Sequence, residues 1–352
     1  MRVALVAHPD NPEYLKDLFK DEGFELVEQE CSSESEYINL LKDADGAIVY
    51  LSPLTTRSIM EASPKLKVIS RGGVGVDSID LEAATEMGIC VCNTPGINTT
   101  EVADHAMSML LSLTRQVREQ DALVKKGYWA DKTELVTPFR SKLVRIAGNV
   151  VGIIGLGNIG KAFSTRIKGF GPSKIIAYDP YVDQTTADLF GVQLVDLDSL
   201  LEESDFITIH APATEETNHL INDEAFHKMK DSCILINCAR GPLVDPAALF
   251  NALKNNLISS AGIDVTEKEP ISSEDPLLTL DNLIITPHTA GSSPVSRAEG
   301  TRKQAENVMR ILSGKSPHGL ANPEVIKTIA LMKADNNARW DGFNSFDTSL
   351  NV

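Results

Sequence analysis

The sequence lacks both a long hydrophobic run and an excess of basic residues. No apolar stretch approaches the roughly 20 residues that a membrane-spanning helix needs, and the N-terminal MRVALVAHP is typical of a strand, not of a signal peptide. Lys and Arg together number 33 against 49 Asp and Glu, which gives a net charge of -16. This charge disfavours a broad basic surface for nucleic acid or anionic lipid, and an anionic ligand needs a local positive site.

Cysteine is scarce, and its spacing offers no zinc or redox motif. The cysteines are odd in number and none forms a CxxC pair, so we expect reduced thiols, a cytoplasmic location and no metal. Cys90 and Cys92 alternate in the apolar stretch GICVCNTP, which places both on one face of a strand. The cysteines are Cys31, Cys90, Cys92, Cys233 and Cys238.

The chain is too long for a single hydrophobic core. Its 352 residues exceed the roughly 250–300 at which cores usually split, so two domains are expected. Short apolar runs alternate with amphipathic segments from the start, which predicts βα units and a parallel sheet. These runs and segments are Val3–Ala7, Tyr14–Lys20, Ala47–Tyr50 and Val68–Ser70.

A long helical pattern separates this first series from a second one. Residues 101–127 form a continuous helical pattern that Thr99 or Thr100 can cap, and a helix of this length can bridge two domains. Residues 296–315 are typical of an amphipathic helix that returns to the first domain, whereas the stretch from Lys333 has no clear period. The expected strands of the second series are VVGIIGL, KIIAYD, FITIHAP, CILINCA, SAGIDV and NLIITPH.

These patterns predict the fold class. Short runs rich in β-branched residues, each followed by helix or turn sequence, are typical of buried parallel strands. We expect an α/β protein with two doubly wound, Rossmann-like parallel-sheet domains, the first of them built discontinuously from both ends of the chain.

The most specific single motif is GLGNIGKAF, which starts at Gly155. It follows the strand VVGII and opens a helix, which is the context that a dinucleotide-binding glycine motif requires. Gly155 permits the tight turn, Gly157 lets the backbone approach a pyrophosphate, and Gly160 lets the helix pack close to the strand. The phosphates would lie at the positive end of the helix.

An acidic residue at the end of the next strand selects the dinucleotide. Asp179 lies 19 residues after Gly160, where a carboxylate hydrogen-bonds the adenosine ribose 2′-OH in this fold. The same carboxylate would repel a 2′-phosphate, and Tyr181 stands where a compensating Arg could have been. We therefore expect NAD. The alternative is that Asp179 and Pro180 form only a strand-ending turn.

Three polar residues follow consecutive predicted strands. Arg240 follows CILINCA, Glu269 lies after SAGIDV and His288 follows LIITP, so all three are expected at one rim of the sheet. Arg240 can bind a substrate carboxylate, and His288 can exchange a proton with the carbonyl oxygen. Glu269 would favour the imidazolium form of His288. The set predicts hydride transfer between a nicotinamide and C2 of a small 2-hydroxy or 2-oxo acid.

Each of these residues also has a simpler interpretation. Arg240 can be a turn residue before Gly241, Glu269 one carboxylate of the acidic segment EKEP, and His288 a histidine that merely ends a strand. The functional interpretation is favoured because the three occur together and follow a dinucleotide motif.

The same segments resemble those of a known family, the D-isomer-specific 2-hydroxyacid dehydrogenases. GLGNIG, NCARGPLVD, GIDVTEKEP and TPHTAG are similar to the nucleotide-domain segments of that family. RGGVGVDSID and NTPGINTTEVADHAM are similar to its first-domain and hinge segments. Matching segments in family order across about residues 1 to 325 are far more specific than the glycine motif alone.

The resemblance implies a role for particular residues. Arg240, Glu269 and His288 would be the catalytic residues, and Asp264 would contact the nicotinamide carboxamide. The backbone of Val74 and Gly75 would hold the substrate carboxylate. Other implied cofactor contacts are Val76, Thr100, Asn158, Ile159, Pro180, His210, Ala211, Pro212, Thr217, Cys238, Ala239 and Gly291, and other implied substrate contacts are Leu51, Ser52 and Gly73.

The resemblance also implies domain roles and an assembly. Residues 1–99 and 291–352 would form the substrate-binding domain, and residues 100–290 the NAD-binding domain. The family forms homodimers through the nucleotide domain, so we expect a homodimer, with a small 2-oxo or 2-hydroxy acid as substrate and neither nucleic acid nor membrane as partner.

Departures from the family pattern bear on the substrate. In the 3-phosphoglycerate dehydrogenases of the family, the first-domain loop after the second predicted strand carries an Arg for the phosphate. Here that loop has Leu51 and Ser52, and Arg57 comes later. Glyoxylate, hydroxypyruvate or a small aliphatic 2-oxo acid fits better. Two alternatives are 3-phosphoglycerate and, in a different class, an NAD(H)-sensing corepressor, because one fold can serve several functions.

Overall fold

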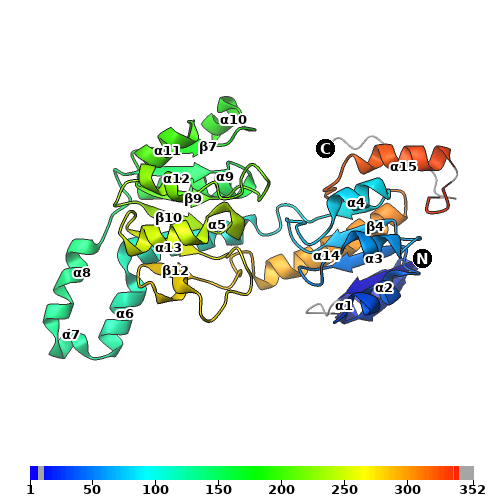
Figure 1. Ribbon diagram of the computed structural model, residues 1–352, viewed down its shortest axis with the longest axis horizontal. Coiled ribbons are helices and arrows are strands. Elements are labelled where there is room, and N and C mark those ends of the chain that lie inside the picture. The colour runs from blue at the N-terminus through cyan, green and yellow to red at the C-terminus, as the bar shows by residue number, and fades with distance from the viewer. Residues whose placement is uncertain (7–11, 336, 341–352) are drawn as a thin grey trace. The chain divides into compact units, whose positions relative to one another are not determined.

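The computed structural model describes residues 1–6, 12–335 and 337–340 (Figure 1). The chain forms two compact units, which we name the split unit, Met1–Asn98 with Ser293–Val352, and the central unit, Thr99–Ser292. Each is an α/β unit around a parallel sheet, so the predicted fold class is confirmed. Within the described residues, no helix is both long and apolar enough to span a bilayer.

The split unit is built on a five-stranded parallel sheet with the order β2-β1-β3-β4-β5. Ala7, which the sequence pattern included in the first strand, lies outside the described residues. The strand β2 was not predicted, because its charged sequence ELVEQ lacks a clear apolar run. The strands are β1 (Arg2–Val6), β2 (Glu25–Gln29), β3 (Gly46–Val49), β4 (Val68–Arg71) and β5 (Cys90–Cys92).

Two apolar clusters cover the two faces of this sheet. Val3 and Leu5 belong to one cluster and Ala4 and Val6 to the other, because successive side chains of a strand point to opposite faces. The helices α1 and α14 cover the face of Val3, and α2, α3 and α4 cover the other. These helices are α1 (Pro12–Asp21), α2 (Glu34–Leu41), α3 (Arg57–Glu61), α4 (Leu81–Glu86) and α14 (Pro294–Leu312).

The end of the described chain is tied to this unit. The helix α15 (Val325–Ala334) contacts α4, and beyond it Trp340 is only 1% exposed. The Trp340 indole Nε1 donates a hydrogen bond to the Gly88 carbonyl over 2.9 Å. Part of the segment without sequence periodicity is therefore core, while residues 341–352 lie outside the described residues.

The central unit contains a seven-stranded parallel sheet with the order β12-β11-β10-β9-β6-β7-β8. The six predicted strands are present, and the two-residue strand β8 extends the sheet at one edge. They are β6 (Val150–Ile154), β7 (Lys174–Tyr178), β8 (Gln193–Leu194), β9 (Phe206–Ile209), β10 (Ile234–Asn237), β11 (Ser260–Ile263) and β12 (Leu283–Ile285).

Helices cover both faces of this sheet. The side chains of α5 and α9 pack in one apolar cluster with Val151 and Ile153, and α11, α12 and α13 pack in the other with Ile154. The helical segments outside the arm are α5 (Thr99–Arg115), α9 (Asn158–Ile167), η2 (Lys168–Phe170), α10 (Gln184–Leu189), α11 (Leu197–Glu203), α12 (Asp223–Lys228), η3 (Gly241–Leu243), α13 (Pro246–Lys254) and η4 (Pro276–Thr279).

The expectation of one continuous helix over residues 101–127 was wrong. The helix α5 ends at Arg115, because Gln116 adopts a left-handed conformation with φ of 48°. The chain continues into an arm, residues 117–142, whose helices stand away from the sheet of the central unit (Figure 1). The arm contains α6 (Val117–Lys125), α7 (Tyr128–Asp131), η1 (Thr133–Leu135) and α8 (Thr137–Lys142).

Candidate active site

The glycine motif forms a tight turn between β6 and α9. Gly155 has a φ of 90°, and a Cβ on it would lie 2.7 Å from the backbone nitrogen of Ala211. A Cβ on Gly160 would collide with the Gly155 carbonyl oxygen. A side chain at Gly160 would push α9 away from the end of β6, and one at Gly155 would strike the backbone that follows β9.

The first turn of α9 is open to a ligand. Gly157 is the N-cap, provides no capping side chain, and a Cβ on it would meet nothing within 4 Å. The first amides of the helix therefore face space at the positive end of the helix dipole, which suits a pyrophosphate. A side chain at Gly157 would occupy this space, so the glycine keeps it open for the pyrophosphate of NAD.

Asp179 binds the glycine turn as well as ending β7. Its carboxylate accepts hydrogen bonds from the amides of Leu156 at 2.7 Å and Tyr181 at 2.9 Å. These bonds orient the carboxylate beside the turn and leave further lone pairs for a ribose hydroxyl. Sequence reasoning anticipated the position of Asp179 but not its contact with Leu156.

His210 directly follows β9, which pairs with β6, the strand before the glycine turn. Burial lowers the pKa of His210 to about 3, so its ring is neutral at physiological pH and is not a general acid there. Its Nε2 lies 3.0 Å from the Thr208 hydroxyl, and among the described residues its buried Nδ1 has no hydrogen-bond partner. Because β6 and β9 neighbour each other where the strand order reverses, this is the crevice in which α/β sheets bind ligands.

The three candidate catalytic residues follow three neighbouring strands. Arg240 follows β10, Glu269 lies in the loop after β11, and His288 follows β12. Parallel strands have their carboxyl ends at one edge, so the sheet places these residues on the same rim.

Arg240 is fixed by a buried asparagine that sequence reasoning missed. Asn237, 1% exposed, donates from Nδ2 to the Arg240 carbonyl at 2.9 Å and accepts from the Ala239 amide at 3.0 Å. One guanidinium nitrogen of Arg240 donates to the Ala239 carbonyl at 2.7 Å. The next residue, Gly241, is so close to the Thr266 backbone that a Cβ would collide with it, which brings the Arg240 turn against the loop of Glu269.

Glu269 and His288 form a direct pair. The His288 Nδ1 lies 2.6 Å from Glu269 Oε2, and the other Glu269 oxygen accepts from the Thr266 amide at 3.1 Å. Because a carboxylate only accepts, Nδ1 must carry the proton, and Nε2 is left for a ligand. Both side chains are about one-third exposed, as a group that meets substrate must be.

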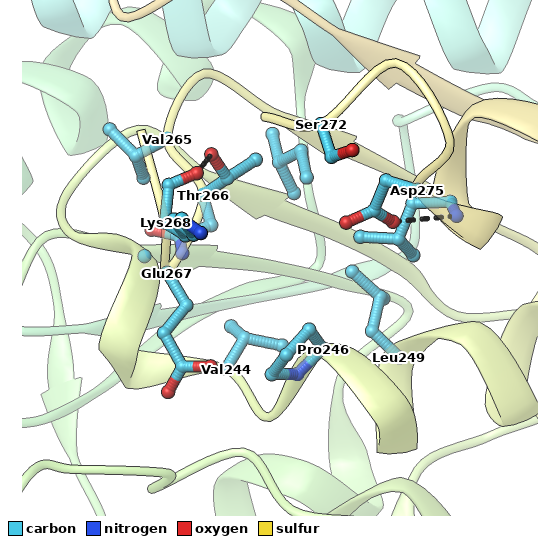
Figure 2. Close-up of a pocket in the computed structure, with 13 residues that line it drawn as sticks. Val244, Pro246, Leu249, Val265, Thr266, Glu267, Lys268, Ser272 and Asp275 are labelled. Atoms are coloured by element: carbon cyan, nitrogen blue, oxygen red, sulfur yellow. Dashed lines mark hydrogen bonds between the residues drawn. The ribbon is translucent and has the colours of Figure 1, made fainter. Parts of the chain in front are cut away.

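A cavity of about 150 Å³ lies beside this loop. Figure 2 shows the Thr266–Lys268 segment facing the start of α13 across it, with the Thr266 hydroxyl bonded to the Lys268 carbonyl. Apolar side chains such as Leu249 and Ile263 line much of the cavity, and Glu267 at its edge pairs with His219 at 2.7 Å. The cavity contacts the segment before Glu269 but includes none of the three catalytic candidates.

The predicted substrate loop, Gly73–Val76, belongs to the split unit. The Gly73 amide donates to the Thr94 hydroxyl at 3.0 Å, and Asn93 Nδ2 donates to the Val74 carbonyl at 2.7 Å. Among the described residues, these bonds involve the Gly73 amide and the Val74 carbonyl but not the amides of Val74 and Gly75. Val74 is 39% exposed, so its backbone is accessible to a carboxylate.

Arg71, which the sequence analysis did not single out, lies beneath this loop. It ends β4, is only 6% exposed, and its guanidinium occupies the space that a Cβ on Gly73 would need. The arginine that sequence reasoning did consider, Arg57, instead pairs with Glu86 at 2.8 Å on the surface. Leu51 and Leu54, in the loop after β3, are more than half exposed.

The remaining predicted cofactor contacts lie mostly in the central unit. Thr217 closes the loop after β9 by donating to the Pro212 carbonyl at 2.8 Å. Cys238 is buried, and its burial raises the pKa of the thiol above its usual range. Thr100, Asn158, Ile159, Pro180, Ala211, Ala239 and Gly291 also belong to the central unit, whereas Val76, Leu51 and Ser52 belong to the split unit. The described residues contain no cluster of three His, Cys, Asp or Glu side chains suited to a metal ion.

Comparison with known proteins identifies the family. Residues 107–290 match the family described as "D-isomer specific 2-hydroxyacid dehydrogenase, NAD binding domain". The chain is 40% identical over 311 residues to a glyoxylate reductase of Korarchaeum cryptofilum, covering 88% of this chain and 90% of that one. The chain belongs to the D-isomer-specific 2-hydroxyacid dehydrogenases.

Two further similarities describe the range of the family. The chain is 41% identical to a D-3-phosphoglycerate dehydrogenase of Methanocaldococcus jannaschii, over 82% of this chain but only 54% of that protein. A holo form of D-mandelate dehydrogenase from Rhodotorula graminis aligns with a TM-score of 0.82 and 29% identity, over 91% of this chain and 97% of that one. This member of the family is thus an NAD-dependent oxidoreductase, as the glycine motif predicted, while the selection of NAD over NADP by Asp179 stays a prediction.

Proposed function

We propose that this dehydrogenase interconverts a small 2-oxo acid, of the size of glyoxylate or hydroxypyruvate, and the corresponding D-2-hydroxy acid. The observation that carries the proposal is the His288–Glu269 pair. The two residues follow β12 and β11, which lie beside the strand of Arg240, β10, in the sheet that also carries the glycine turn. A proton donor, a carboxylate-binding cation and a dinucleotide cradle are the groups that this reaction needs.

Each residue has a distinct part in the proposed reduction. NADH, when bound, supplies the hydride that adds to C2 of the substrate. Arg240 binds the substrate carboxylate, and His288 gives the proton on Nε2 to the carbonyl oxygen as negative charge develops there. Glu269 accepts the Nδ1–H of His288 and so fixes the orientation of the ring while the Nε2 proton is transferred. In the oxidation direction, neutral His288 takes the hydroxyl proton back.

The split unit supplies the proposed substrate loop. The amides of Val74 and Gly75 bind the substrate carboxylate, and Gly73 fixes the loop through Thr94. Leu51, 52% exposed, offers an apolar wall for the substrate's remaining substituent and no charge for a phosphate. A small or aliphatic 2-oxo acid is favoured on this basis. The similarity to the glyoxylate reductase of K. cryptofilum supports the same choice.

A second candidate substrate is 3-phosphohydroxypyruvate. The specific observation in its favour is Arg71, a nearly buried cation directly beneath Gly73. The M. jannaschii relative is a phosphoglycerate dehydrogenase, but the chain spans only about half of its length. Because Arg71 is only 6% exposed, the small unphosphorylated acid remains the first choice.

The arm supports the predicted homodimer. Neither α6 nor α7 buries a residue within the described chain, and Trp129 is 65% exposed with Val117 at 56%. Large apolar side chains exposed on a projecting segment are typical of an interface. The proposed assembly is a homodimer in which this arm of the central unit covers a second copy of the chain.

The experiment is a measurement of NADH oxidation against a panel of 2-oxo acids. The panel contains glyoxylate, hydroxypyruvate, pyruvate, 2-oxoisocaproate, oxaloacetate and 3-phosphohydroxypyruvate. The proposal predicts turnover on the order of 1–1000 per second with a small unphosphorylated acid. Preference for 3-phosphohydroxypyruvate would favour the second candidate, and tight NADH binding with no turnover of any acid would favour a sensor of the corepressor class.

A further inference from the structure

A hydrogen-bonded cluster joins the two segments through which the chain passes between its units. The chain leaves the split unit between Asn98 and Thr99 and returns to it between Ser292 and Ser293. His105 lies in the second turn of α5, just after the first crossing, and its Nε2 is 3.0 Å from the hydroxyl of Thr286, just before the second. Two residues of the central unit that lie 181 positions apart in the sequence are thus in contact.

The direction of this hydrogen bond follows from the bonds around it. The Thr286 hydroxyl donates its single hydrogen to Asp264 Oδ1 at 2.5 Å. It can therefore only accept from His105, so His105 Nε2 must carry the hydrogen. The order is His105 to Thr286 to Asp264, with each donor polarised toward a carboxylate that is 1% exposed.

Asp264 in turn holds the turn that carries His288. Its carboxylate accepts from the amides of Thr289 at 2.9 Å and Ala290 at 2.8 Å. Its backbone carbonyl accepts from the His288 amide at 2.7 Å. We name residues 286–290 the His288 turn; Asp264 thus binds it through both main chain and side chain.

The His288 turn needs this support because its backbone is strained. His288 has a φ of 53°, in the left-handed region that costs a residue with a Cβ about 1–2 kcal/mol. Such a conformation persists only where surrounding bonds over-determine it. The conformation aims Nδ1 at Glu269, so a relaxed turn would misplace the imidazole.

We propose that His105 is a positioning residue, which acts through Thr286 and Asp264 to hold the His288 turn in its strained conformation. His105 Nε2 also lies 3.8 Å from Asp264 Oδ1. The catalytic part of this inference rests on the proposed function, whereas the structural part does not. It makes the start of α5 a support of the catalytic rim in addition to a link between units.

Amide hydrogen exchange of the protein without cofactor tests the structural part. In His105→Leu, which removes the donor and keeps an apolar side chain, exchange in residues 286–292 should become about 10-fold faster, the effect of losing one hydrogen bond near 1.4 kcal/mol. Exchange in β6 and β7 should stay unchanged. His227→Leu, which alters an exposed histidine of α12, is the matched control and should change neither region. Equal exchange in the His105→Leu and parent proteins would overturn the proposal.

Kinetics with the best acid of the panel tests the catalytic part. His105→Leu should lower kcat about 10-fold with less than about a two-fold change in the KM of the acid, because the loss is in orientation of His288. His105→Gln should recover most of kcat, since the Gln amide can reach Thr286 from the position of Nε2. An equally impaired Gln variant would show that the ring, not its hydrogen bond, matters.

A double-mutant cycle completes the test. Thr286→Val removes the hydroxyl at constant shape, and Thr286→Ser keeps it. The double variant with His105→Leu should be no slower than Thr286→Val alone, because both changes break the same chain of bonds. Additive losses would contradict a common path through Thr286. If no acid is turned over, the proposed function fails, while the exchange experiment still decides the role of His105.

Discussion

The His288 turn and the arm belong to the same central unit, yet they are built in opposite ways. In the turn, the Asp264 carboxylate accepts hydrogen bonds from the amides of Thr289 and Ala290, and the Asp264 carbonyl accepts one from the His288 amide. These bonds within one chain hold the strained backbone of His288. In the arm, α6 and α7 bury no residue, and Trp129 is exposed to solvent. The turn is complete in one chain, whereas the arm leaves apolar surface that one chain does not cover.

This difference separates what the chain does alone from what it does in an assembly. A buried polar network fixes geometry, because each unmade bond would cost about 1–3 kcal/mol. An exposed aromatic residue on a projecting helix gains free energy only when another surface covers it. Chemistry should therefore depend on the turn and association on the arm, with little effect of either on the other.

The largest expected effect concerns the turn. His288→Ala should lower kcat by about 100- to 10,000-fold, because it removes the proton donor for the carbonyl oxygen. NADH affinity, followed by fluorescence titration, should change less than about two-fold, and the oligomeric state should match that of the parent protein. His227→Ala on α12 is the control. An unchanged kcat would remove His288 from the acid role.

The arm provides the second test. Trp129→Glu should weaken self-association at least about 30-fold, the effect expected for a buried aromatic anchor worth about 2 kcal/mol. Sedimentation velocity should then show monomer at concentrations where, under the proposed assembly, the parent protein sediments as a dimer. Leu189→Glu is a matched control, because Leu189 is 78% exposed on α10, outside the arm. If Trp129→Glu sediments as the parent does, the arm is not the interface.

A third test asks whether Asp179, beside the glycine turn, sets the preference for NADH over NADPH. Asp179→Ala should raise the kcat/KM ratio of NADPH to NADH about 100-fold, because it removes like-charge repulsion of a 2′-phosphate. Asp183→Ala is the control. Asp183 also accepts a hydrogen bond from a backbone amide, that of Thr186, but it does so as the N-cap of α10. A variant that rejects NADPH as strongly as the parent would place the discrimination elsewhere.

The smallest effect concerns the dependence of stability on pH. Because the pKa of His210 is about 3 in the folded protein and its ordinary value is 6.5, the unfolded chain binds a proton between these values that the folded chain does not. Stability should therefore fall as pH decreases below 6.5, and at pH 5 the loss from His210 should be about 2 kcal/mol.

Urea unfolding of the parent protein and His210→Gln at pH 7.5 and pH 5 measures this contribution. The Gln variant should lose about 2 kcal/mol less between these two conditions, whatever its stability at pH 7.5. Parallel losses in both proteins would show that His210 is not kept neutral by burial.

Local patterns were sufficient to predict most strands of the two sheets and the rim on which the candidate catalytic residues lie. The buried strands of the central unit have short β-branched runs, and the glycine turn has a motif whose backbone demands are local. Arg240, Glu269 and His288 could be found because each follows such a strand, and parallel strands share one rim. Their roles remain predictions that the experiments above test.

What could not be predicted depends on contacts between distant residues or on competing local energies. Gln116 breaks α5 without a glycine or proline to indicate it, since helical periodicity continues on both sides. Trp340 packs in an apolar cluster of the split unit and bonds to the carbonyl of Gly88, far earlier in the chain, neither of which a local pattern indicates. His105 looks like an ordinary helix residue until Thr286 is brought beside it.

The most direct test of the central claim is to follow a deuterium label from the cofactor. The protein is incubated with NADH deuterated at the reactive C4 position and with hydroxypyruvate, and the product is analysed by NMR and chiral chromatography. The account predicts D-glycerate with deuterium bound to C2, and loss of this product in His288→Ala. Deuterium retained in the cofactor, or an L-configured product, would contradict it.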